Sequence, residues 1–100
     1  MRNSLSRSLK SIAGRFSDMI LVDVYVPSLG ATYDFRVDET VKLTSVVQEI
    51  SEMLTNKYKS ELNKPAEEFM LCSLTDNRIL NSSISLTENN ITNGCKLLMV

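Results

Sequence analysis

Alternating apolar and polar positions predict a β-hairpin over residues 19–37. Apolar residues occupy every second position from Ile20 to Val26 and again from Tyr33 to Val37, which is the period of a strand with one buried face. Pro27-Ser28-Leu29-Gly30 interrupts the alternation, and Gly30 can supply the positive φ that a turn with a bulge requires. We therefore expect two antiparallel neighbouring strands.

A helical period follows the hairpin. Apolar residues recur at steps of three and four and form one stripe, which consists of Leu43, Val46, Val47, Ile50, Met53, Leu54 and Tyr58. The start of this helix is open, because Thr40 and Thr44 can each cap it, and Ser45 with Gln48 fits a capping box. The segment predicts an amphipathic helix that covers one face of a sheet.

The rest of the chain alternates short apolar segments with polar loops. We expect, in order, a loop at 60–68, a strand at 69–74, a turn at 75–77, a short strand at 78–80, a loop at 81–94 and a last strand at 96–100. Ile84, Leu86 and Ile91 are the expected anchors of the long loop. The whole pattern predicts an α+β fold with the order ββαββ.

Alternation also assigns the strand residues to two faces of the sheet. The expected core beneath the helix consists of Val24, Phe35, Val47, Ile50, Leu97 and Met99, with Val22 and Tyr33 also facing inward. Leu21, Tyr25, Leu98 and Val100 then face outward.

The third strand is apolar at nearly every position, so its orientation is less constrained. With Met70, Cys72 and Leu74 inward, Phe69, Leu71 and Ser73 face outward; the opposite register, which buries Phe69 and Leu71, stays open. An exposed apolar patch of this kind marks an interaction site. The predicted protein-binding residues of the sheet are therefore Leu21, Phe69, Leu71, Leu98 and Val100.

Composition and charge divide the chain near Asp18. One hundred residues fit one domain, with no apolar run that could span a membrane and no secretory signal, so we expect a cytoplasmic protein. Residues 1–18 carry four basic side chains against one acidic one, whereas residues 19–100 have a net charge of −4. We therefore expect a basic extension at 1–18 and a domain at 19–100 whose acidic character disfavours nucleic-acid binding.

The extension has an amphipathic pattern of its own. Leu5, Leu9, Ile12 and Phe16 fall on one side of a helix. Such a segment can dock on its own domain or on a second copy in a homodimer, can stay unfolded, or can bind a membrane surface. The sharpest hypothesis is that it folds back and covers the apolar patch of the sheet.

Chemical groups for catalysis are scarce. The chain has no histidine, and its glycines are isolated, so neither general acid–base catalysis nor a phosphate loop is indicated. Cys72 lies on a predicted strand and Cys95 at the start of the last one, where buried free thiols are favoured over a disulfide, and two cysteines are too few for a metal site. Glu67 and Glu68 are best interpreted as solvated. We expect no enzyme, no metal and no cofactor.

The closing segments carry a family resemblance. Asn77-Arg78-Ile79-Leu80, the stretch from Ser85 to Ile91, and the stretch from Thr92 to Val100 resemble the C-terminal half of ubiquitin. With Tyr33-Asp34-Phe35-Arg36-Val37, the chain is most similar to the YukD/EsaB-type ubiquitin-like proteins of bacterial type VII secretion systems. The resemblance implies a ubiquitin-like β-grasp fold and a small cytosolic component that works beside a membrane-embedded secretion ATPase, without conjugation.

Two departures from the relatives affect the expected function. Conjugated modifiers end in a flexible Gly-Gly tail, whereas this sequence stops at Met99-Val100, so we expect no conjugation. The basic extension is not typical of the family. We therefore expect a protein-binding adaptor or regulatory subunit, and the alternative is a peripheral membrane module anchored by the basic helix.

Overall fold

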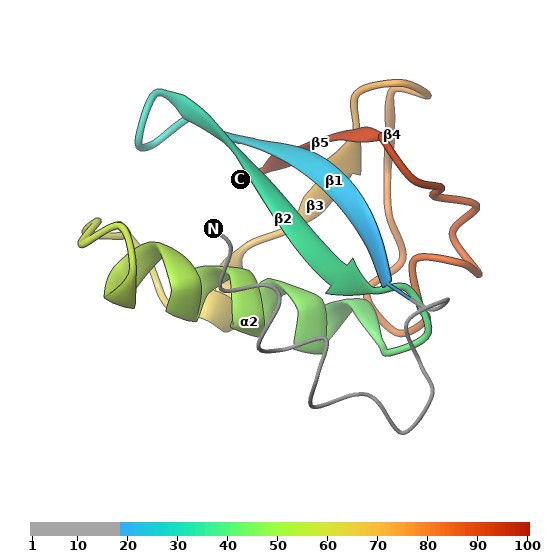
Figure 1. Ribbon diagram of the computed structural model, residues 1–100, viewed down its shortest axis with the longest axis horizontal. Helices are drawn as coiled ribbons and strands as arrows, with labels where there is room; N and C mark the ends of the chain where they lie inside the picture. Colours follow the sequence, from blue (N-terminus) through green and yellow to red (C-terminus); the bar gives the residue numbers. More distant parts are fainter. Residues whose placement is uncertain (1–18) are drawn as a thin grey trace.

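The computed structural model describes residues 19–100. Their elements are β1 (Met19–Val26), β2 (Ala31–Asp38), α2 (Leu43–Asn56), the 3-10 helix η2 (Ala66–Glu68), β3 (Leu71–Ser73), β4 (Arg78–Ile79) and β5 (Lys96–Met99) (Figure 1). This order confirms the predicted succession of a hairpin, a helix, a strand, a short strand and a last strand, so that three strands follow the helix. The predicted helix in residues 1–18 lies outside the described residues.

The hairpin forms with the expected turn. Its strands pair from Met19 opposite Asp38 to Val26 opposite Ala31. The amides of Leu29 and Gly30 both donate to the carbonyl of Val26 at 2.9 Å. Gly30 has a φ of 64°, a conformation that costs glycine little because it has no Cβ.

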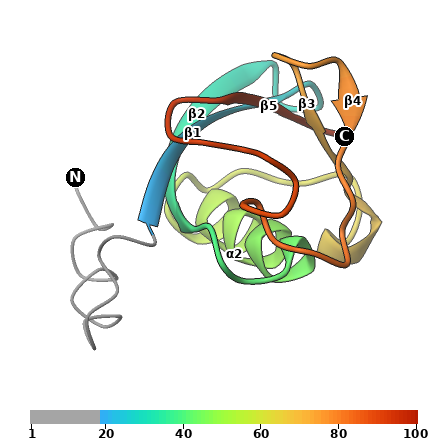
Figure 2. The same cartoon turned by 90° about the vertical axis from the view of Figure 1, so that its right-hand side faces the viewer.

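The strands form one mixed sheet in the order β2-β1-β5-β3-β4. β1 and β5 lie parallel, and the other three pairings are antiparallel. α2 packs across one face of the sheet, and no described element covers the other face, so residues 19–100 form two layers (Figure 2). A mixed sheet that holds one helix in this way is a β-grasp fold.

The core lies between these layers and agrees with the prediction. All six expected core residues are buried, and Ile50 is fully buried near the middle of α2. Leu86 and Ile91 of the long loop are buried as predicted, whereas Ile84 is only half-buried. Apolar residues from both layers and from the loop therefore form a single core cluster.

The start of α2 differs from the prediction. The helix begins at Leu43, after an N-cap residue, Lys42, that has no side-chain capping bond, so the expected caps were wrong. The Leu43 amide instead donates to the carbonyl of Ile84 at 2.9 Å. A carbonyl from the long loop thus satisfies one of the free amides that a capping side chain usually binds.

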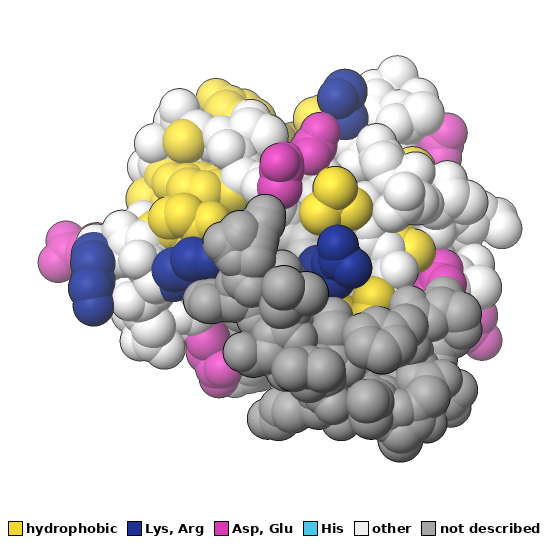
Figure 3. Space-filling view, in the orientation of Figure 1, with side chains coloured by type: hydrophobic (Ala, Val, Ile, Leu, Met, Phe, Trp, Pro, Cys, Tyr) yellow, Lys and Arg dark blue, Asp and Glu magenta, His cyan; other side chains and the backbone are white. Residues whose placement is uncertain are grey.

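An aromatic cluster closes the core beside the free edge of β2. The rings of Tyr33 and Tyr58 lie 4.9 Å apart between centroids, and those of Tyr33 and Phe35 lie 6.2 Å apart. Lys57 Nζ lies 5.7 Å from the centre of the Tyr58 ring. Figure 3 shows hydrophobic side chains gathered between the hairpin and the C-terminal end of α2.

Candidate protein-binding surface

A row of apolar side chains crosses the open face of the sheet. Tyr25 pairs with Leu98, Leu98 pairs with Cys72, and Cys72 pairs with Ile79. Because directly paired residues point to the same face, these four side chains are neighbours across β1, β5, β3 and β4. Tyr25 is 39% exposed and Ile79 is 66% exposed, so solvent reaches the row at both ends.

Further apolar residues widen the row on both sides. Met70 and Val100 exchange two backbone hydrogen bonds, at 2.6 and 3.0 Å, and Leu74 donates to the carbonyl of Lys96. Met70 and Leu74 flank Cys72 at alternate positions, and both are exposed. We call the combined surface the open-face patch; it comprises Tyr25, Met70, Cys72, Leu74, Ile79, Leu98 and Val100.

The predicted orientation of the third strand was wrong. Leu71 and Phe69, expected on the open face, are buried, as is Ser73, whereas Met70 and Leu74, expected in the core, are exposed. The cause is the pairing with β5: Leu71 lies opposite Met99 and Ser73 opposite Leu97, and both of these β5 residues face the helix side. Leu71 and Phe69 therefore belong to the core and not to the binding surface.

The remaining predicted site residues have mixed positions. Leu98 and Val100 lie in the open-face patch, half-buried. Leu21 is 41% exposed and points to the same face, but Asp23 separates it from Tyr25 along β1. The four residues predicted in the extension, Leu5, Leu9, Ile12 and Phe16, lie outside the described residues.

Sequence reasoning missed the residues that β3 and β4 contribute to the patch. Met70, Cys72 and Leu74 were assigned to the core, and Ile79 was assigned to no face. Ser73 is the one polar residue in this strand, so it is the only local indicator of which face is exposed. If Ser73 is buried, the exposed face is entirely apolar; if Ser73 is exposed, the exposed face contains a serine. The sequence of the strand alone does not decide between these two orientations; the pairing with β5 does.

The two cysteines occupy different surroundings. Both are free thiols, as expected, but they are half-buried instead of buried. Cys72 lies at the centre of the open-face patch, between Leu98 and Ile79. Within residues 19–100, no three His, Cys, Asp or Glu side chains come together in a way that could hold a metal ion.

A carboxylate pair borders the patch on the side of β2. Asp23 and Asp34 lie opposite each other on β1 and β2, and Lys96 Nζ lies 3.4 Å from Asp23 Oδ2. A side-chain hydrogen bond with Asp34 is the main cause that holds the pKa of Asp23 below its ordinary value of 3.8; burial opposes this, and Lys96 lowers the pKa further. Charges of both signs thus adjoin the apolar surface.

Asp23→Asn is expected to make the free energy of unfolding less sensitive to acid. A group whose pKa is lower in the folded state contributes stability that is complete above its unfolded pKa and is lost as the pH falls through its folded pKa. The difference in unfolding free energy between the chain and the variant should therefore shrink between about pH 6 and about pH 2. Denaturant unfolding at the two pH values measures it, and an unchanged difference would contradict the assignment.

Comparisons with known proteins identify the fold. No protein-family model and no curated protein matches the chain by sequence. Among solved structures, it is similar to the ubiquitin-like domain of an Arabidopsis thaliana protein, with a TM-score of 0.62 and 22% identity over 82% of this chain and 76% of that one. It is also similar to Caldiarchaeum subterraneum ubiquitin, with a TM-score of 0.61 and 13% identity over 81% and 90% of the two chains.

A third likeness is to the ubiquitin-like domain of Plasmodium falciparum Dsk2, with a TM-score of 0.58 and 17% identity over 82% of this chain and 99% of that one. Together the three show that the chain has the ubiquitin-like β-grasp fold, as its closing segments predicted. The narrower resemblance to YukD/EsaB-type proteins stays a prediction. Within the described part of the chain, no helix has both the length and the apolar character that crossing a membrane requires.

Proposed function

We propose that this protein is a ubiquitin-like adaptor or regulatory subunit that binds another protein through its open-face patch. The observation that carries the proposal is the row Tyr25, Leu98, Cys72 and Ile79, which runs across four strands on a face that no described element covers. A contiguous apolar surface exposed to water is costly for a monomer and typical of an interaction site. The protein acts in this proposal by binding and not by catalysis.

The border of the patch indicates what the partner presents. Asp23 pairs with Lys96 across β1 and β5, on the same face as Tyr25, and Lys96 Nζ lies 3.4 Å from Asp23 Oδ2. Protein interfaces commonly combine an apolar centre with a polar rim that stays near solvent. The expected partner therefore places an apolar side chain over Cys72 and Leu98 and polar groups of both signs around it.

A narrower form of the proposal assigns the protein to a type VII secretion system. It rests on the sequence resemblance at residues 33–37 and 91–97, and it implies a partner that is part of a membrane-embedded ATPase and a cytosolic location for this chain. Phe35 and Val37 are buried, and Gly94 has a φ of 87°. These motif residues therefore have structural roles in the fold. They support a place in a type VII secretion system only through the sequence resemblance.

Replacing Tyr25 with a photoreactive phenylalanine analogue tests the proposed surface in cells that make this protein. Light should attach one partner protein to this position, and Ile79→Asp should lower the yield of that adduct about tenfold or more, because a carboxylate in an apolar contact costs more than about 1.4 kcal/mol. Ile79 lies on an edge strand and is mostly exposed, so the fold should persist.

Ser45→Asp is the matched control for this experiment. Ser45 is exposed in the first turn of α2, on the other layer of the molecule, so its substitution should leave the adduct unchanged. If Ile79→Asp and Ser45→Asp give the same adduct yield, the open-face patch is not the binding surface.

A further inference from the structure

A groove runs along α2 on the side that faces residues 60–71. One cavity of about 450 Å³ lies between the first half of α2, η2 and the β3–β4 edge. A second, shallow cavity that is mostly open to solvent lies between the second half of α2 and residues 60–66. Gln48 and Ala66 line both cavities, so the two adjoin. We call them together the helix groove.

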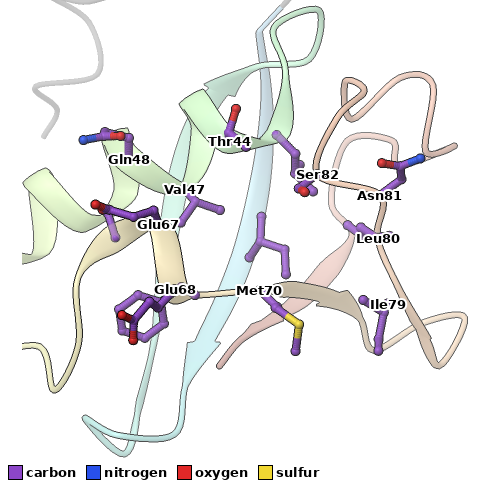
Figure 4. Close-up of a pocket in the computed structure, with 14 residues that line it drawn as sticks. Thr44, Val47, Gln48, Glu67, Glu68, Met70, Ile79, Leu80, Asn81 and Ser82 are labelled. Atoms are coloured by element: carbon purple, nitrogen blue, oxygen red, sulfur yellow. The ribbon is translucent and has the colours of Figure 1, made fainter.

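The helix groove combines an apolar floor with an acidic rim. In the first cavity, Val47, Leu71 and Leu80 are buried, and Figure 4 shows Val47 and Gln48 near Glu67 of η2 at one side. The carboxylates that line the two cavities are Glu52, Glu61, Glu67 and Glu68, and the cation is Lys64. Lys64 Nζ lies 5.1 Å from the centre of the Phe69 ring, so the ammonium group interacts with that ring. The rim has excess negative charge.

An unpartnered hydroxyl lies in the wall of the second cavity. Ser51 is 6% exposed, and its Oγ has no hydrogen-bond partner among residues 19–100. A buried polar atom without a partner costs free energy that a bound chain can recover by supplying a donor or an acceptor. This observation is independent of the carboxylates and also indicates a ligand.

We propose that the helix groove binds residues 1–18 of the same chain. That segment carries Arg2, Arg7, Lys10 and Arg15 against Asp18, so its charge is opposite to that of the rim. Its apolar residues are spaced for one side of a helix and suit the floor; they are Leu5, Leu9, Ile12 and Phe16. A basic amphipathic segment in an apolar groove follows a common mode of helix recognition.

The length of the segment suits the helix groove, and its attachment point sets the path that it must take. Eighteen residues in a helix span about 27 Å, and the 14 residues of α2 span about 21 Å. The segment joins β1 at Met19, which pairs with Asp38, and the chain reaches the start of α2 at Leu43 soon after. Leu43 and Thr44 line the first cavity, but β1 and β2 form one edge of the sheet and the groove lies beside η2 and the opposite, β3–β4 edge (Figure 2). The residues next to Met19 must therefore pass around the start of α2 before the rest of the segment can lie in the groove. Met70 and Ile79 of the open-face patch also line the first cavity, so a segment seated there shares these two residues with the patch and leaves its other five free for a partner.

Carbodiimide cross-linking of the full chain tests the proposal. The reagent joins an ammonium group to a carboxylate that contacts it, and Lys10 is the only lysine in residues 1–18. Mass mapping should find Lys10 joined to Glu52, Glu61, Glu67 or Glu68. In a mixture of ¹⁴N- and ¹⁵N-labelled protein, both joined peptides should carry the same isotope. Mixed-isotope links would overturn binding within one chain and assign the groove to a second copy.

A pair of double variants provides the control. Glu67→Gln/Glu68→Gln should abolish the links to these two residues and weaken those to Glu52 and Glu61, because it lowers the negative charge of the rim. Asp76→Asn/Glu88→Gln, which removes the same charge away from the groove, should leave all of these links unchanged. In the full chain, Arg7→Glu/Lys10→Glu should shift the amide resonances of Gln48, Ser51 and Glu67 and leave that of Leu98 in place.

Two results would overturn the proposal. One is a link from Lys10 to Asp23 or Asp34, which would place the segment on the open face of the sheet. The other is the absence of any Lys10 link to the groove carboxylates. If the full chain then sediments with vesicles of phosphatidylcholine and phosphatidylglycerol in equal parts but not with phosphatidylcholine alone, the segment is a membrane anchor.

Discussion

Ile50→Ala is expected to lower the free energy of unfolding by about 2–5 kcal/mol, the range for emptying a buried aliphatic site. Ile50 is fully buried, on the face of α2 that packs against the sheet. The loss combines the transfer of the missing methyl and methylene groups with the cavity that rigid neighbours leave open. In a domain of this size, such a loss would unfold a large share of the molecules. Chemical denaturation followed by circular dichroism measures it.

Thr55→Ala on the same helix is the matched control. Thr55 is exposed, and alanine favours the helix more than threonine does, so the free energy of unfolding should change by less than about 0.5 kcal/mol. If Ile50→Ala costs less than about 1 kcal/mol, the buried face of α2 is assigned incorrectly.

Asn89→Ala is expected to cost about 2–4 kcal/mol, because it leaves one buried and two part-buried backbone groups without partners. Asn89 is 4% exposed. Its Nδ2 donates to the carbonyls of Asn81 and Ser85 at 3.0 and 2.9 Å, and its Oδ1 accepts from the Asn81 amide at 2.9 Å. These bonds hold the loop that carries Leu86 and Ile91 into the core. Thermal unfolding of the variant and of the unchanged chain measures the loss.

Asn63→Ala controls for the loss of an amide side chain as such. Asn63 is exposed in the segment between α2 and η2, and an exposed substitution of this kind usually changes stability by less than about 0.5 kcal/mol. Equal melting temperatures for the Asn89 and Asn63 variants would show that the hydrogen bonds of Asn89 do not support the loop.

The elements that could be predicted from the sequence are those that bury only one face. β1 alternates strictly because one of its faces contacts the core, and the stripe on α2 repeats because only one side of the helix contacts the sheet. Every second residue from Ile20 to Val26 is apolar and buried, and so are Leu43, Val46, Val47, Ile50 and Leu54 of the helix stripe, so local pattern and tertiary structure agree at these positions.

β3 shows why the candidate surface was only partly predictable. Five of the six residues from Phe69 to Leu74 are apolar, because one face of this strand is in the core and the other belongs to the open-face patch. Period alone then cannot decide between two registers. The decision comes from the pairing of Leu71 with Met99, which joins residues 28 positions apart and leaves no local signal.

The start of α2 was mispredicted for a related reason. Threonine and serine near residue 43 favour a side-chain cap, yet the Leu43 amide bonds to a carbonyl at residue 84. A distant loop can replace a local cap wherever the fold brings a carbonyl to the helix end. Capping residues in the sequence therefore indicate roughly where a helix starts, but they do not show which group binds its first amides.

The central position of β5 constrains how the molecule folds. β5 lies between β1 and β3, so without it the β1–β2 and β3–β4 hairpins share no strand contact. Val24 meets Leu97 only when 73 positions of chain have closed into a loop, and contacts of such high sequence separation slow the search for the native state. On a ribosome, neither the core nor the row through Leu98 can assemble until residues 96–99 have left the exit tunnel. The domain and its candidate binding surface therefore form in the same late step, and a nascent chain offers no partner a finished surface before the fold is complete.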